Sequence, residues 1–124
     1  MESIGLAGRR SDWSLDAFAA VFRSTVWRVS RNSATSITLT LADDPCVVFL
    51  DENIYAEEEL TPDRLESVRN RVANPVFFSA AYKEVECVRD FLTYLASTDL
   101  LACYWEDFVT VQEVLNIIAS KSAE

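Results

Sequence analysis

The chain has 124 residues, of which 50% are apolar and 25% are charged, and its net charge is −9. A chain of this length forms one domain with a single core, which hides about two-thirds of the surface that the unfolded chain exposes. The sequence contains no histidine and only two glycines. These counts exclude the nucleophile triads and zinc sites that need histidine, and the glycine-rich loops that bind phosphate groups.

The cysteines and the apolar runs bear on the location of the protein. Cys46, Cys87 and Cys103 are odd in number, form no CxxC pair and lie in apolar segments. We therefore expect reduced, buried thiols, which are typical of a cytosolic protein. No apolar run approaches the roughly 20 residues of a membrane helix, and the first residues lack the basic and apolar regions of an export signal. The sequence predicts a cytoplasmic protein that does not contact a membrane.

The first predicted feature is a flexible tail over residues 1–11, which precedes a single domain over residues 12–124. A helix of about three turns is predicted from Leu15 because apolar side chains recur there at helical spacing, with Asp12 or Ser14 as its N-cap. Residues 36–41 alternate between apolar and polar side chains, which is typical of a strand with one buried face. The pattern over residues 25–32 is ambiguous.

The middle of the chain alternates between predicted strands and helices. Residues 46–50 form a continuous apolar run, which favours a strand covered on both faces. After an acidic loop over residues 51–60, Thr61 and Pro62 provide an N-cap and a first-turn proline, and Pro75 ends the helix that they begin. Residues 76–82 predict a further strand, and residues 83–97 predict a helix with a wide apolar face.

The last predicted strand covers residues 100–105 and is followed by a helix that begins with a capping box of Thr110 and Glu113. From residue 46 onward, strands and helices alternate, and the right-handed crossover rule then favours parallel neighbours. The strand over residues 36–41 is expected to pair antiparallel with the next strand. We expect an α/β fold with a small mixed, partly parallel sheet of about four to five strands and about four flanking helices.

Two pairs of acids follow predicted strands, Asp51 with Glu52 and Glu106 with Asp107. If these strands are parallel, the four carboxylates lie at one edge of the sheet, where they can hold Mg²⁺ or form an acidic docking face. Acids are also ordinary residues at strand ends and turns. The pattern by itself therefore does not decide between a site and a solvated edge.

The acidic loop contains Glu57, Glu58 and Glu59 together with Tyr55, and residues 42–63 contain eight acids and no base. Clustered carboxylates accelerate association with a basic partner, and an aromatic side chain adds apolar contact area. The same negative field repels nucleic-acid phosphates. A solvated loop is the alternative interpretation. Trp105, beside Glu106, adds an aromatic residue of the kind enriched at protein interfaces.

We interpret the chain as a non-enzymatic acidic binding protein, most concretely an inhibitor or immunity-type protein that neutralises a basic, nuclease-like toxin. We expect a monomer or weak homodimer with no catalytic residue, metal or cofactor. The alternatives are a Mg²⁺-dependent phosphoryl-transfer or hydrolase-type enzyme that uses the strand-end carboxylates, and an adaptor subunit that dimerises through apolar helix faces. The residues expected to bind the partner are Asp51, Glu52, Tyr55, Glu57, Glu58, Glu59, Trp105, Glu106 and Asp107.

Overall fold

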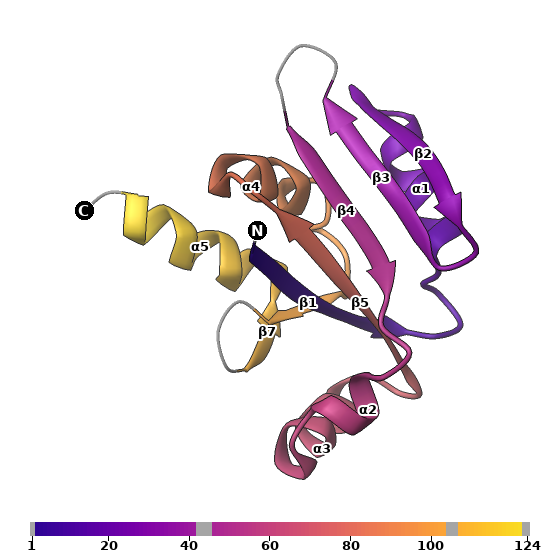
Figure 1. Cartoon of the computed structure of the whole chain (residues 1–124). Coiled ribbons are helices and arrows are strands. Elements are labelled where there is room, and N and C mark those ends of the chain that lie inside the picture. Colours follow the sequence, from indigo (N-terminus) through magenta and orange to yellow (C-terminus); the bar gives the residue numbers. More distant parts are fainter. Residues whose placement is uncertain (1, 42–45, 104–106, 123–124) are drawn as a thin grey trace.

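The computed structural model describes residues 2–41, 46–103 and 107–122, with Lys121 and Ser122 described by their backbone only. The strands are β1 (Glu2–Arg9), β2 (Trp27–Ser33), β3 (Ser36–Leu41), β4 (Val47–Glu52), β5 (Pro75–Tyr82), β6 (Leu101–Cys103) and β7 (Phe108–Thr110). The helices are α1 (Leu15–Arg23), α2 (Ala56–Glu59), α3 (Pro62–Arg71), α4 (Val85–Thr93) and α5 (Val111–Ser122). The seven strands form one sheet in the order β2-β3-β4-β5-β1-β6-β7 (Figure 1).

Every strand pair in this sheet is antiparallel, so the expectation of a smaller, partly parallel sheet is wrong. β5 and β6 do run in the same direction, as a crossover through α4 requires. However, β1 lies between them and pairs antiparallel with both. β4 and β5 are antiparallel neighbours because α2 and α3 connect them at one end of the sheet (Figure 1).

The segment expected to be a flexible tail is a central strand. β1 pairs with β5 from Glu2 to Arg9 and with β6 through Gly5, Leu6 and Ala7. Its Leu6 side chain is fully buried. The prediction of a tail is wrong because pairing on both sides and burial supply the order that the local sequence does not suggest. The folded unit therefore begins well before residue 12.

The sheet carries an apolar core on each face. The larger core lies between the sheet and helices α1, α4 and α5, and it includes Phe18, Phe91 and Ile118. The smaller core lies under α2 and α3. Phe77 and Phe78 are consecutive in β5 and belong to different cores, because successive strand residues point to opposite faces. The residues of the smaller core are Ala7, Ala56, Val68, Val72, Phe77 and Leu101.

Helices α2 and α3 cover only part of their face of the sheet (Figure 1). Val47 and Phe49 in β4 are therefore half-exposed, whereas Val48 and Leu50 are buried. The expectation of a strand covered on both faces is wrong for β4. The first part of β5 is instead covered on both faces, since four consecutive residues from Pro75 are buried.

Cys46 and Cys87 form a disulfide, contrary to the expectation of reduced thiols. Cys46 directly precedes β4 and Cys87 lies in α4, and both side chains are buried in the larger core. Their Cα atoms lie 5.3 Å apart, although 41 positions separate them in the sequence. Because the proximity is created by packing α4 on the sheet, spacing along the chain did not reveal it.

Several local predictions are confirmed. Ser14, rather than Asp12, caps α1 and accepts a hydrogen bond from the Ala17 backbone N–H at 3.1 Å. Thr110 Oγ1 accepts from the Glu113 N–H at 3.1 Å, as in a capping box. No helix in the described part of the chain is long and apolar enough to span a membrane.

Candidate partner-binding surface

The expected acidic loop is partly helical. After β4, the Asn53 backbone N–H donates to the carbonyl of Phe77 at 2.9 Å, and the Asn53 side chain accepts from the Tyr55 N–H at 3.1 Å. These bonds turn the chain into α2, a helix of four residues. Ala56 is the buried residue of α2 and packs in the smaller core. Because α2 contacts the sheet through this small side chain, its three glutamates are left in solvent.

Two large apolar side chains lie next to these glutamates in the chain. Ile54 is 67% exposed and Tyr55 is 58% exposed, and few large hydrophobic residues of the described chain are comparably exposed. The α2 patch is the set of exposed residues at this turn: Ile54, Tyr55, Glu57, Glu58 and Glu59. Ile54 was not among the predicted interface residues. The sequence did contain a signal for Ile54, because this apolar residue lies inside an acidic segment and belongs to no periodic apolar pattern.

The glutamates of the α2 patch differ in their partners. Glu57 Oε1 lies 3.2 Å from Arg69 Nη2 of α3, and about half of each side chain is exposed. An ion pair at this exposure contributes little to stability, but it neutralises part of the charge. Glu58 and Glu59 form no ion pair within the described residues. These two carboxylates therefore carry the uncompensated charge of the patch.

Asp51 and Glu52 do not act as one carboxylate pair. They end β4 rather than follow it, so their side chains point to opposite faces of the sheet. Asp51 is exposed, in register with Ser79 of β5. Glu52 is half-buried and lines a groove beside α1.

The second predicted acidic pair is separate from the first. Trp105 and Glu106 lie outside the described residues. Asp107 precedes Phe108 in β7, and the register runs from Asp51 through Ser79, Gly5 and Cys103 to Phe108. Four strand spacings of about 4.8 Å separate Asp51 from Phe108 by about 19 Å.

The strand order explains this separation. β5, β1 and β6 lie between Asp51 and Asp107, so the expectation that the strand-end acids meet at one edge of the sheet is wrong for these two residues. Within the described residues, no group of three or more Cys, Asp or Glu side chains is placed to hold a metal ion.

Cys103 of β6 is not placed to act as a nucleophile. Burial raises the pKa of the Cys103 thiol; nearby Arg64 opposes this shift and Asp107 adds to it. At neutral pH the thiol is therefore protonated, and a protonated thiol is a poor nucleophile. Cys87 is held in the disulfide.

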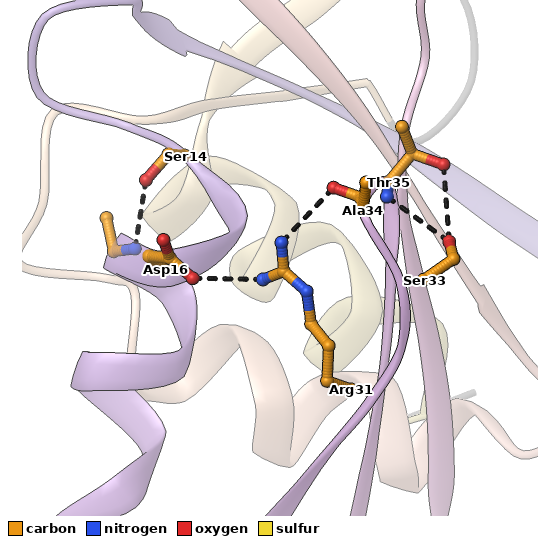
Figure 2. A network of polar contacts seen from close by, with 7 residues as sticks. Ser14, Asp16, Arg31, Ser33, Ala34 and Thr35 are labelled. Atoms are coloured by element: carbon orange, nitrogen blue, oxygen red, sulfur yellow. Dashed lines mark hydrogen bonds and ion pairs between the residues drawn. The ribbon is translucent and has the colours of Figure 1, made fainter.

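Two adjoining cavities form a groove at the end of the sheet where β4 ends. The first, of about 240 Å³, lies beside the N-terminus of α1, and the second, of about 280 Å³, lies beside α2. Arg10, Glu52 and Val76 line both cavities. Asp16, Arg31 and Ala34 line the first cavity. The Arg31 guanidinium donates to Asp16 of α1 at 2.9 Å and to the carbonyl of Ala34 at 3.2 Å (Figure 2).

Comparisons of the chain with protein family models, with curated proteins and with solved structures found no match.

Proposed function

We propose that this protein is a non-enzymatic binding protein that docks a basic protein through the α2 patch, as an inhibitor or immunity-type protein docks a basic toxin. The observation that carries the proposal is the pair of exposed apolar side chains, Ile54 and Tyr55, next to three exposed glutamates. A loop that serves only solubility needs charges, and it gains nothing from exposing an isoleucine and a tyrosine.

The two kinds of residue have different roles in this proposal. The carboxylates of Glu58 and Glu59, with the net charge of −9, attract a basic partner and raise the association rate. Ile54 and Tyr55 become buried on docking and slow dissociation, because aromatic and aliphatic anchors contribute most of the binding energy at interfaces. Nucleic acid is not the proposed partner, because the same field repels phosphates.

The test uses the product of the neighbouring gene, if that product is basic and toxic when expressed alone. Its binding to Glu58→Lys/Glu59→Lys is compared with its binding to Glu86→Lys/Asp90→Lys, which makes the same change in net charge on α4. Glu57 is kept, because a lysine at that position repels Arg69. We expect the first variant to lower the association rate constant by about tenfold or more at low salt, and the second to lower it much less. Equal effects would place the contact elsewhere.

The apolar half of the patch is tested by Tyr55→Ala, with Val26→Ala as the control. Both side chains are largely exposed, and Val26 lies just before β2, away from α2. We expect Tyr55→Ala to raise the dissociation rate constant by about tenfold and Val26→Ala to leave it unchanged. A Tyr55→Ala variant that dissociates like the original protein contradicts the proposal.

The oxidation state of the cysteines indicates the compartment in which the protein is located. The cytoplasmic expectation rested on reduced cysteines, and the Cys46–Cys87 disulfide removes that argument, since disulfides persist in oxidising compartments. The number of cysteines that are alkylated when cells of the native host are lysed in denaturant with a thiol-blocking reagent decides the question. One alkylated cysteine assigns the protein and its partner to an oxidising compartment, whereas three assign them to the cytoplasm.

A further inference from the structure

The groove at the end of the sheet holds an opposite pair of charges that do not neutralise each other. Arg10 and Glu52 line both of its cavities. Neither forms an ion pair within 4.0 Å among the residues that the structure describes. The Arg10 Nη2 atom donates to the carbonyl of Pro75 at 3.3 Å, which holds the guanidinium at the groove.

The other charges around the groove are already paired. Arg31 Nη1 contacts Asp16 Oδ1 at 2.9 Å, and Glu57 contacts Arg69 at 3.2 Å. Arg10 and Glu52 are therefore one cation and one anion that line the same groove, and neither forms an ion pair with another described residue. A ligand with a single charge satisfies one of them and is repelled by the other. A ligand with both charges satisfies both.

We propose that this groove binds a free α-amino acid with an apolar side chain. The ligand carboxylate pairs with the Arg10 guanidinium, which is suited to carboxylate geometry, and the ligand ammonium pairs with Glu52. Apolar walls lie beside this charged pair. In the first cavity they are formed by Trp13 and Val76, and in the second by Val76, Ile54 and Phe77.

The dimensions of the groove agree with a small ligand. Each cavity is slightly smaller than the roughly 300 Å³ at which pockets for drug-sized ligands begin. One cavity therefore has room for an amino acid rather than for a nucleotide or a sugar chain. Ile54 belongs both to the α2 patch and to the wall of the second cavity. The two proposals can still fail separately, because docking of a basic protein requires neither Arg10 nor a filled groove.

Calorimetric titration with L-leucine, L-leucinamide and N-acetyl-L-leucine tests the proposal. Leucinamide lacks the carboxylate and N-acetyl-leucine lacks the ammonium, so each probe removes one of the two ion pairs. We expect leucine to bind with a Kd of about 1 mM or below. We expect each analogue to bind at least about tenfold more weakly, because each loses a charge-assisted hydrogen bond.

Two variants assign the binding to the groove. Arg10→Gln removes the partner of the ligand carboxylate, so this variant is expected to bind leucine and leucinamide equally. Glu52→Gln removes the partner of the ligand ammonium, so this variant is expected to bind leucine and N-acetyl-leucine equally. Arg28→Gln and Glu86→Gln change exposed charges that do not line the cavities, and they are expected to bind leucine like the original protein. Melting curves of all four variants establish that each is folded.

The indole N–H of Trp13 supplies a second readout, since Trp13 lines the first cavity and its Nε1 donates to Asp99 at 3.1 Å. Leucine at about 1 mM, the expected Kd, is expected to shift the NMR signal of this N–H in the original protein and to shift it much less in Glu52→Gln. The proposal is overturned if leucine does not bind at about 10 mM, ten times the expected Kd. It is also overturned if the three probes bind equally, or if Arg10→Gln and Glu52→Gln leave leucine binding unchanged.

Discussion

Replacement of Gly8 by alanine tests the position of β1 in the fold. A Cβ atom at Gly8 would lie 2.6 Å from Cδ1 of Trp13 and 2.8 Å from Cδ2 of Leu100. Carbon atoms that are not bonded make favourable contact at about 3.5–4.0 Å, so one of these side chains must move. Trp13 does not move freely, because its indole donates to Asp99 and its ring lies 4.7 Å from that of Phe18.

The expected loss of stability has two parts. Overpacking a core position costs about 1–3 kcal/mol, and loss of the Trp13–Asp99 hydrogen bond adds about 1 kcal/mol. We therefore expect Gly8→Ala to lower the free energy of unfolding by about 3 kcal/mol. For a chain of 124 residues, this loss lowers Tm by about 10 °C.

The matched control is Gly5→Ala on the same strand. The nearest atoms to a Cβ at Gly5 are those of Phe108 at 3.5 Å and Cys103 at 3.6 Å, which are ordinary contact distances. An added methyl group there should change stability by less than about 1 kcal/mol, helped by the lower entropy of the unfolded chain. Urea unfolding followed by circular dichroism measures both variants. Equal stabilities for Gly8→Ala and Gly5→Ala would refute the packing of β1 against Trp13.

Two further predictions concern the cysteines. Reduction of the disulfide, which spans 41 positions, is expected to lower the free energy of unfolding by about 4 kcal/mol. Urea unfolding with and without dithiothreitol measures this loss, and an unchanged unfolding midpoint contradicts the cross-link. Burial raises the pKa of the Cys103 thiol, so the folded protein favours the neutral thiol. The contribution of this thiol to the free energy of unfolding is therefore fully present below the ordinary thiol pKa, and it is lost as the pH rises through the raised pKa. In the folded protein iodoacetamide should therefore alkylate Cys103 only at higher pH than in urea, and identical pH profiles would exclude the shift.

The sequence predicted most elements that local patterns specify. The helix from Leu15, the alternating strand that became β3 and the capping box at Thr110 are all present. These features depend on neighbours along the chain, such as the hydrogen bond from Ala17 to Ser14. Patterns of this kind are read directly from spacing.

The sequence did not predict the features that depend on distant contacts. Residues 1–11 were expected to form a flexible tail, yet β1 is a central strand in which Gly8 is required because Trp13 packs directly on it. The crossover rule favoured parallel neighbours, which is wrong here, because no local pattern indicated that β1 lies between β5 and β6. This insertion replaces a parallel pair of β5 and β6 by two antiparallel pairs with β1.

The same limit applies to the candidate site. The exposure of Tyr55 and of the following glutamates was predictable because these residues lie in one acidic segment. The separate directions of Asp51 and Glu52 depend on β4 continuing to Glu52, two residues beyond the apolar run. The approach of Arg10 to Glu52 depends on the order of β4, β5 and β1 in the sheet.

The most direct test of the proposed function is amide hydrogen exchange of the protein alone and in complex with its basic partner. We expect new protection over residues 51–60, which contain the α2 patch and the end of β4, and no change over β2 and β3. Protection on β2 and β3 with unchanged exchange over residues 51–60 would contradict docking through the α2 patch.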